Sequence, residues 1–370
     1  MRVVYDHQIF GWQEYGGISR YFYELALEMN RLPETEAMIV SSVFINRYLL
    51  QAPKNLRIFG RLVPKFPKSG RIIRLANALL AKPLLAYLKP DIVHETYYSR
   101  ARVAPKSSKV VVTVFDMIHE LFESNFNRFD QTSRDKLAAV ERADHVICIS
   151  ENTRSDLIRL FNIDPVKISV THLGFSLDKE NMSTTPVVSS GPYILYVGSR
   201  LGYKNFEQLV RAFAILKADI FDMRLVCFGG GALTRAELAL AKNLGITLSD
   251  IVQVSGADNI LANLYSHAQV FVYPSLYEGF GIPPLEAMSC GCPVACSETS
   301  SIPEVVGQAA VYFDPLSSHS MAKAIRTLLE NHSLRTQMIG AGYERIKHFS
   351  WKRCAIETKA VYGRLLWGPN

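Results

Sequence analysis

The feature that most constrains the fold of this sequence is an alternation of short apolar runs with helical stretches. In the first half, near-continuous apolar runs are separated by segments of helical pattern, notably 17–32, 130–143 and 151–161. Apolar strands that alternate with helices are typical of a parallel sheet covered on both faces. The strands expected here are 3–5, 38–44, 92–94, 110–115, 145–150 and 168–172.

The alternation stops in a segment rich in Ser, Thr, Pro and Gly and then restarts. The strands expected after this break are 193–198, 224–228, 251–254, 270–274, 293–297 and 310–313. A chain of 370 residues is also too long for one ordinary core. We therefore expect an α/β fold of two doubly wound, Rossmann-like domains facing a central cleft. Their expected bounds are 1–178 and 193–349, with a linker over 179–192 and a last helix within 350–370.

The net charge of +7 is unevenly distributed. No acidic residue occurs from Ala37 to Pro90, and apolar residues are interleaved with the cations of this segment. Two interpretations stay open, namely docking on an anionic bilayer surface and a solvated loop and helix face. No nucleic-acid-binding module accompanies the charge, so nucleic acid is not an expected partner. The cations are Arg47, Lys54, Arg57, Arg61, Lys65, Lys68, Arg71, Arg74, Lys82 and Lys89.

Neither a secretory signal nor a membrane-spanning helix is expected. Residues 1–5 begin directly as a strand, and the longest apolar stretch, 75–88, is interrupted by Lys82 and Pro83. We expect a cytoplasmic protein, either soluble or peripheral on the membrane. The six cysteines include one close pair, Cys290 and Cys292, with no second pair at zinc-site spacing, so we expect reduced structural thiols and no metal.

The richest stretch for chemistry is 274–288, where a strand ends in a glycine-bearing turn and Pro283 and Pro284 begin a helix. The backbone amides of 279–281 (Gly279, Phe280 and Gly281) would lie beside a helix N-terminus, which suits a diphosphate. Glu278 and Glu286 are carboxylates that can accept hydrogen bonds from sugar and ribose hydroxyls. The structural alternative is that Glu286 caps the helix and that Glu278 faces solvent.

Two cations follow the first strand of the second half. Gly198 ends that strand, and Arg200 and Lys204 come directly after it, where a doubly wound fold presents a phosphate site. In the first half, Gly16 and Gly17 open a helix after the first strand, where they permit close backbone approach. Neither a Gly-x-Gly-x-x-Gly fingerprint nor a Walker loop is present.

In this order and spacing, these elements resemble the retaining glycosyltransferase family with the GT-B fold, known as glycosyl transferases group 1. The Glu-x7-Glu hallmark of that family matches Glu278 and Glu286. The resemblance implies that Arg200 and Lys204 bind the donor diphosphate, that Glu278 binds the transferred sugar, and that Glu286 holds the ribose. It also implies that the amides of 16–17 face the phosphates and that the last helix crosses back onto the N-terminal acceptor domain.

The first half of the chain matches the catalytic pattern of that family less well than the second half does. Many members of the family have a His before the residue equivalent to Asp116, whereas this chain has Phe115. Asp116 is expected to orient the sugar or the acceptor, with His119 as a possible compensation from the next turn. His94 and Glu95 end the preceding strand and are acceptor-side candidates, although a structural histidine is an equally good interpretation of His94 and of His119.

The expected reaction is transfer of a hexose from a nucleoside diphosphate sugar, with retention and without a metal cofactor. The 5–10 and 15–21 segments look most like bacterial O-antigen mannosyltransferases, so GDP-mannose is the expected donor and a polyprenyl-diphosphate-linked oligosaccharide the expected acceptor. Three alternatives stay open: a UDP- or dTDP-sugar transferase of the same fold, a sugar-nucleotide epimerase, and a non-catalytic sugar-nucleotide-binding subunit.

Overall fold

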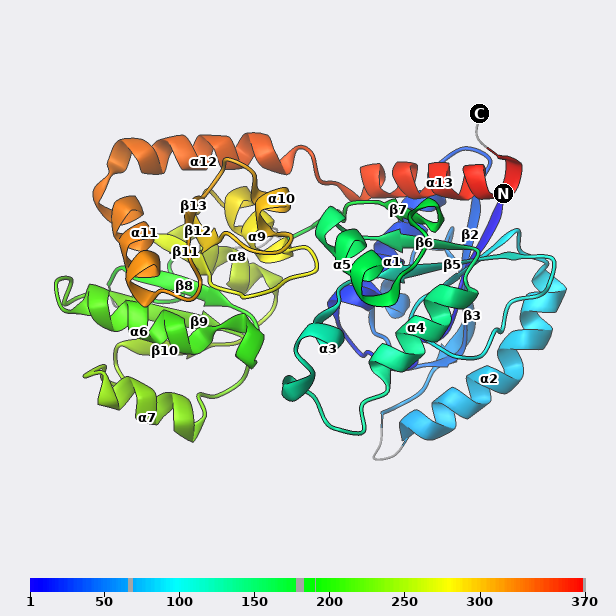
Figure 1. Ribbon diagram of the computed structural model, residues 1–370, viewed down its shortest axis with the longest axis horizontal. Coiled ribbons are helices and arrows are strands. Elements are labelled where there is room, and N and C mark those ends of the chain that lie inside the picture. The colour runs from blue at the N-terminus through cyan, green and yellow to red at the C-terminus, as the bar shows by residue number, and fades with distance from the viewer. Residues whose placement is uncertain (66–68, 178–182, 190, 369–370) are drawn as a thin grey trace. The chain divides into compact units, whose positions relative to one another are not determined.

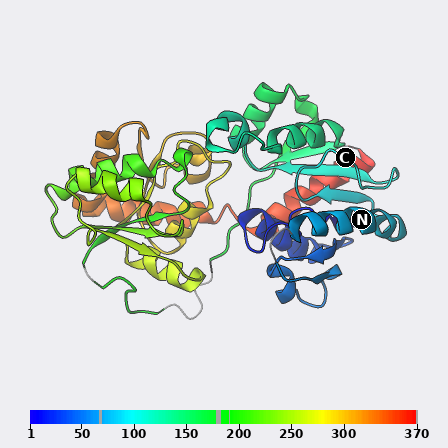
Figure 2. The ribbon, with the colours of Figure 1, turned by 90° about the horizontal axis from the view of Figure 1, so that it is seen from below.

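The computed structural model describes residues 1–65, 69–177, 183–189 and 191–368, and it divides into two compact units. Unit 1 comprises Met1–Gly174 and Phe349–Asn370, and unit 2 comprises Phe175–His348. In each unit a parallel sheet carries helices on both faces (Figures 1 and 2). Within the expected linker, residues 179–182 and 190 lie outside the described residues.

The sheet of unit 1 has seven parallel strands in the order β3-β2-β1-β4-β5-β6-β7. The order reverses between β1 and β4, and ligands bind α/β sheets at such a switch point. The strands are β1 (Arg2–Tyr5), β2 (Glu36–Phe44), β3 (Arg57–Leu62), β4 (Ile92–Glu95), β5 (Lys109–Val114), β6 (His145–Cys148) and β7 (Ile168–Val170). The edge strand β3 was not expected from the sequence, whereas the other six were.

The helices of unit 1 connect these strands as an α/β sheet requires. They are α1 (Gly17–Met29), α2 (Ser69–Leu88), α3 (Ile118–Leu121), α4 (Thr132–Arg142), α5 (Glu151–Phe161) and the C-terminal α13 (Trp351–Trp367), with 3-10 turns at Tyr48–Gln51, Glu123–Asn125 and Pro165–Lys167. The start of α5 shows why a helix begins where it does: the Ser150 hydroxyl accepts a hydrogen bond from the Thr153 amide at 3.1 Å.

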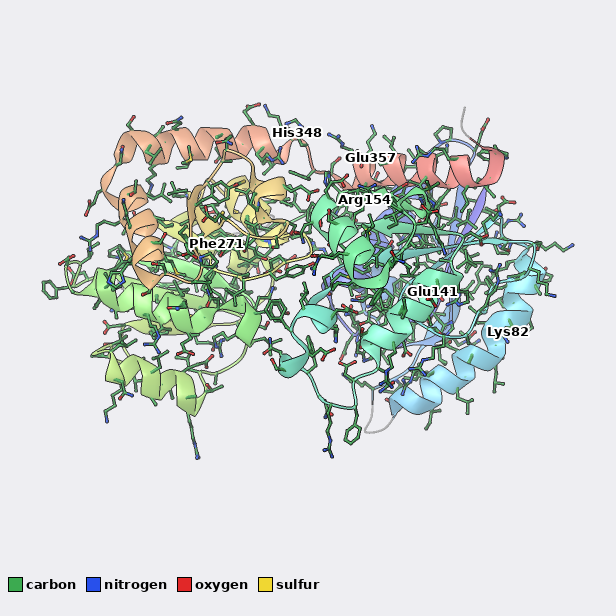
Figure 3. The ribbon with its side chains drawn as sticks, in the orientation of Figure 1. Lys82, Glu141, Arg154, Phe271, His348 and Glu357 are labelled. Atoms are coloured by element: carbon green, nitrogen blue, oxygen red, sulfur yellow. The ribbon has the colours of Figure 1, made fainter. Side chains whose placement is uncertain are left out.

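The sheet of unit 2 has six parallel strands in the order β10-β9-β8-β11-β12-β13, and all six were expected. They are β8 (Tyr193–Val197), β9 (Arg224–Phe228), β10 (Ile251–Val254), β11 (Val270–Tyr273), β12 (Val294–Ser297) and β13 (Val311–Phe313). Phe271 of β11, labelled in Figure 3, is fully buried. Here the order reverses between β8 and β11.

The helices of unit 2 follow its strands in turn. They are α6 (Phe206–Lys217), α7 (Arg235–Asn243), α8 (Asp258–His267), α9 (Ile282–Ser289), α10 (Ile302–Val306), α11 (Ser318–Glu330) and α12 (His332–Ile346), with a 3-10 turn at Gly202–Lys204. The N-terminus of α7 is closed by a capping box, because the Thr234 hydroxyl accepts from the Glu237 amide while the Glu237 carboxylate accepts from the Thr234 amide.

The last helix, α13, packs against α1 and therefore belongs to unit 1, as expected. Ser350 caps its N-terminus by accepting from the Arg353 amide at 3.2 Å. Gly174 makes this return possible, because a Cβ atom there would lie 2.2 Å from the backbone nitrogen of Trp351. Trp351, Cys354 and Tyr362 then fill the interior between α13 and the rest of the unit.

All six cysteines are free thiols, five of them buried, and burial raises the pKa of Cys227 and of Cys354 to about 12. Their high pKa values keep the thiols of Cys227 and Cys354 protonated and unreactive, which is typical of structural cysteines. No helix in the described part of the chain combines the length and the apolar character needed to cross a bilayer.

Candidate functional site

Two loops of unit 2 leave the sheet at its switch point, after the neighbouring strands β8 and β11. The first loop carries Lys204 and the second carries Glu278. The Lys204 ammonium donates to both carboxylate oxygens of Glu278, at 2.7 and 2.9 Å. Both side chains are mostly buried, with exposed fractions of 19% and 9%. The sequence-predicted cation and carboxylate are thus brought together, 74 residues apart in the chain.

Hydrogen bonds also link the two loops to each other and to neighbouring loops of unit 2. Asn205, in a left-handed conformation with φ of 58°, donates to the carbonyls of Pro274 and Pro315 at 3.0 and 2.7 Å. Ser300 accepts from the Glu278 amide at 3.0 Å, and Ser301 donates to the Glu278 carbonyl at 2.8 Å. These hydrogen bonds fix the backbone on both sides of Glu278, which preorganises its carboxylate.

Arg200 lies in the same loop as Lys204 but has different partners. Its guanidinium contacts Glu237 of α7 at 2.8 Å and donates to the carbonyls of Gly229, Gly231 and Ala232 at 3.2, 2.9 and 2.8 Å. The three glycines 229–231 all have positive φ, which only glycine adopts readily and which turns these carbonyls onto the arginine. Arg200 therefore binds the glycine turn after β9 in this conformation.

Glu286 lies in α9, one helical turn beyond the start that Gly281 and Pro283 define. Gly281 has φ of 111°, so a left-handed residue precedes the helix, and Pro283 occupies its first turn. The Tyr265 hydroxyl donates to a Glu286 carboxylate oxygen at 3.3 Å. Glu286 is buried at 9% exposed, and Glu278 is buried as well, which excludes the solvent-facing Glu278 of the structural alternative.

In unit 1, Gly16 directly precedes α1. Its φ of 168° is extended backbone that any residue adopts, but a Cβ there would lie 2.3 Å from the Gln13 side-chain oxygen. That oxygen accepts from the Ser19 amide at 3.2 Å and so occupies one amide of the helix N-terminus. A larger residue at position 16 would therefore have to displace the end of the Gln13 side chain from the helix start.

Asp116 follows β5, and its backbone is held by a buried lysine that the sequence did not single out. The Lys136 ammonium of α4 donates to the Asp116 carbonyl and to the Glu120 carboxylate, both at 2.8 Å. The Lys136 and Glu120 side chains are only 1% and 6% exposed. Phe115 is buried in an aromatic cluster, with its ring edge-on to Tyr21 at a centroid distance of 5.3 Å.

The acceptor-side candidates have partners inside unit 1. His94 is fully buried, and its ring nitrogens lie 2.6 Å from the Tyr362 hydroxyl and 2.8 Å from the Thr113 hydroxyl. Burial without a compensating charge lowers the pKa of His94 to about 3, so the ring is neutral. These contacts are those of a hydrogen-bonded structural histidine, which is one of the two interpretations of His94.

Glu95 and His119 are also engaged. Both Glu95 oxygens accept from the Arg142 guanidinium, at 2.6 and 2.8 Å, while burial raises the pKa of Glu95 to about 7 against the opposing effect of Arg142. His119 stacks on Phe126 with ring centroids 3.9 Å apart, and its Nδ1 lies 3.3 Å from Asp130. Glu95 is therefore a buried ion-pair partner, whereas His119 stays partly exposed.

Comparison with known proteins identifies the family. Residues 178–345 match the family model described as glycosyl transferases group 1, and residues 15–179 match glycosyltransferase family 4. The chain is 31% identical to O-antigen chain mannosyltransferase B of Escherichia coli over 323 residues, which cover 82% of this chain and 83% of that protein. The chain belongs to the group 1 glycosyltransferases.

Two further relatives of this glycosyltransferase bear on its function and fold. It is 30% identical to O-antigen chain mannosyltransferase RfbU of Salmonella typhimurium over 191 residues, 51% of this chain and 52% of that protein. Its fold is similar to that of a sucrose-phosphate synthase from Thermosynechococcus elongatus, with a TM-score of 0.76, 20% identity and full coverage of both chains. The expected GT-B class of fold is thereby confirmed.

Several residues of the glycosyltransferase that shape the candidate site escaped the sequence analysis. Glu237, Asn205 and Lys136 each act through a partner far away in the chain, so spacing alone could not reveal them. Asp6 at the end of β1 is a fourth example, because its carboxylate accepts from the backbone amide and the hydroxyl of Thr96, both at 2.8 Å, across the switch point of unit 1. Among the described residues, no cluster of three His, Cys, Asp or Glu side chains is arranged to hold a metal ion.

Proposed function

We propose that this glycosyltransferase transfers mannose from GDP-mannose, with retention, to a saccharide linked to a polyprenyl diphosphate. The product would be an α-linked residue of a bacterial surface polysaccharide such as an O-antigen, made in the cytoplasm. The observation that carries the assignment of the donor site is the Lys204–Glu278 pair at the carboxyl ends of β8 and β11. The choice of mannose is supported by the 31% identity to an O-antigen mannosyltransferase.

The proposed roles follow from charge and position. Glu278 accepts hydrogen bonds from hydroxyls of the transferred sugar, and Lys204 beside it stabilises the negative charge that develops on the departing diphosphate. The N-terminus of α9, at Gly279 to Gly281, contributes its backbone amides to the same charge. Glu286 holds the ribose, where the nearby Tyr265 hydroxyl fixes the orientation of its carboxylate.

Arg200 is proposed to exchange its partners when the donor binds. Its contacts to the glycine turn are to neutral carbonyls, and a diphosphate is a stronger acceptor for a guanidinium. Glu237, the one charged partner, keeps the guanidinium plane in place during this exchange. The positions of Gly16 and Gly17 at the start of α1 make that helix N-terminus a second candidate for contact with the phosphates.

In the proposed reaction, the bond between the anomeric carbon and the diphosphate oxygen breaks while the acceptor hydroxyl attacks from the same face. The proton of that hydroxyl passes to the departing phosphate oxygen, so the enzyme need not supply a carboxylate nucleophile. Asp116 orients the sugar or the acceptor, with its backbone held by Lys136. Catalysis then rests on positioning and on charge stabilisation.

The deciding experiment measures binding of GDP, UDP and dTDP by calorimetry in the presence of a chelator, followed by product analysis with the preferred donor class. We expect GDP to bind most tightly and GDP-mannose to give an α-linked product by NMR. Preference for UDP or dTDP would replace the donor while keeping the reaction. Sugar release or rearrangement without an acceptor would favour an epimerase, and no nucleotide binding by folded protein would favour a non-catalytic subunit.

A further inference from the structure

Helix α2 is anchored to unit 1 by one face only. Ile73, Ala81 and Leu85 are buried on that face, and the helix packs along β2. The Asn77 side chain fixes the helix in rotation, because it accepts from the Val43 amide at 3.0 Å and donates to the Val43 carbonyl at 2.8 Å. The opposite face of α2 therefore has a defined direction, away from the sheet.

That opposite face is apolar. Ile72, Leu75, Leu79, Leu80 and Tyr87 have exposed fractions of 60%, 63%, 68%, 52% and 81%. They are five of the 18 large apolar side chains that are exposed in the described part of the chain, and they are concentrated on one helix. Ile72, Leu75 and Leu79 follow the three- and four-residue spacing of a single stripe. We call these five residues the α2 face.

Positive charge borders the α2 face. Lys82 lies on α2 (Figure 3), three residues after Leu79 and seven after Leu75, so it continues their stripe at its C-terminal end. Arg74 of the same helix is exposed, as are Arg61 and Lys65 of the segment that leads into it. No acidic residue occurs between positions 37 and 90 to balance these charges locally.

We infer that the α2 face inserts into the interfacial layer of an anionic lipid bilayer, with the helix axis parallel to the membrane. An exposed leucine and isoleucine stripe gains free energy by entering the acyl boundary, and cations at its margin reach the phosphate layer. A segment without acidic residues over 37–90 suits a negative surface, to which each nearby Lys or Arg adds attraction.

The outer face of α13 is the nearest rival surface in unit 1 and fits a membrane less well. It also exposes apolar side chains, Ile356 and Trp367 at 47% and 70%. However, Glu357 follows Ile356 directly and pairs with Arg353 at 2.8 Å, so this face carries a carboxylate beside its apolar side chains. A carboxylate at the lipid surface opposes docking on an anionic bilayer.

The test is sedimentation of the purified full chain with vesicles of phosphatidylethanolamine containing about one-third phosphatidylglycerol, and with phosphatidylcholine vesicles. The key variant is Leu75→Glu/Leu79→Glu. Its matched control is Leu248→Glu/Leu316→Glu in unit 2, which changes two leucines that are 75% and 71% exposed. No donor or acceptor is added, so the result is independent of the proposed reaction.

We expect the wild type and the control to sediment with the anionic vesicles, and the α2 variant to lose about tenfold in partition coefficient. Thermal unfolding should be unchanged in both variants, because all four leucines are exposed. A second measurement uses single substitutions that keep the side chain apolar. The fluorescence of the tryptophan introduced by Leu79→Trp should be quenched by bromine-labelled acyl chains, and that of the tryptophan introduced by Leu248→Trp should not.

Three results would overturn the inference. One is the absence of wild-type binding to anionic vesicles, and another is equal binding by the α2 variant. The third is loss of binding in Arg74→Glu/Lys82→Glu with no effect of the leucine changes, because it would indicate electrostatic adsorption without insertion.

Discussion

The ammonium of Lys204 lies between both carboxylate oxygens of Glu278, at 2.7 and 2.9 Å, and joins two loops that leave adjacent strands of one sheet. Because each charge neutralises the other, the pair can stay in place before a donor arrives. Each group also orients the other, so the loss of either should disturb both the sugar and the phosphate contacts proposed for this site.

Replacing Glu278 with Gln should lower kcat about a hundredfold, which corresponds to roughly 3 kcal/mol of lost stabilisation of the transition state. The amide keeps the shape of the side chain but removes its charge and one acceptor oxygen. Initial rates of sugar transfer at saturating donor would measure the effect. Glu298→Gln is the matched control, because that carboxylate is exposed in the loop after β12 and should be neutral to change. Turnover near the wild-type level in Glu278→Gln would contradict the site assignment.

Replacing Arg200 with Ala should weaken both donor binding and the fold of unit 2. The guanidinium makes a charged contact with Glu237 and binds the carbonyls of the glycine turn, and hydrogen bonds to charged groups contribute about 1.5–3 kcal/mol each when a partner is left unsatisfied. Thermal unfolding and nucleotide titration on the same samples would separate the two effects. Arg211→Ala, which removes an exposed pair with Glu207, should change neither. A variant with reduced stability and unchanged nucleotide affinity would assign Arg200 a purely structural role.

Lys136→Met should destabilise unit 1 by about 3–5 kcal/mol, because it leaves Glu120 buried without its partner. The double variant Lys136→Met/Glu120→Gln should recover part of that loss, since no buried charge remains. Denaturant unfolding of the single and double variants measures the coupling. Lys109→Met, at a surface pair with Asp144, should cost less than about 1 kcal/mol. Equal stability of Lys136→Met and the wild type would contradict a stabilising role for this buried ion pair.

His94 should make unit 1 sensitive to acid. Its pKa falls from 6.5 to about 3 on folding, so between these values the unfolded chain binds a proton that the folded chain does not. Stability is therefore retained above pH 6.5 and is lost as the pH falls toward 3, with a slope of up to about 1.4 kcal/mol per pH unit from this residue alone.

The measurement is the free energy of unfolding against pH for the wild type and His94→Gln. The variant should be less stable at neutral pH, because it loses the paired bonds to Thr113 and Tyr362, yet its curve should be flatter below pH 6.5. His332→Gln, at an exposed position, should reproduce the wild-type slope. Parallel curves for the wild type and His94→Gln would show that the pKa of His94 does not fall on folding.

Local patterns in the sequence predicted much of the fold. All six strands of unit 2 were expected, because each is a short apolar run bounded by polar or glycine-bearing segments. The edge strand β3 was missed because Arg57 and Arg61 interrupt its apolar pattern, as an edge strand with exposed positions allows. Pro83 also obscured α2, which continues through it to Leu88.

The candidate site was predictable in its residue types and only partly in its partners. The sequence indicated Lys204 and Glu278 separately, and their ion pair depends on the strand order that places β8 beside β11. The engagement of Arg200 by Glu237, and of Asp116 by Lys136, depends on contacts across 37 and 20 residues that no short motif encodes. The contact of His94 with Tyr362 of α13 spans 268 residues of the chain, so no local pattern could reveal it.

The close packing of Gly174 against the start of α13 has a consequence for exchanging parts between relatives. Because unit 1 contains both ends of the chain, unit 2 is connected as an insertion with two junctions, at 174/175 and at 348/349. A chimaera built with a single crossover would combine the α13 of one parent with the α1 of another and mismatch a buried interface. A chimaera that keeps α1 and α13 from the same parent must therefore exchange the whole of residues 175–348 as one segment.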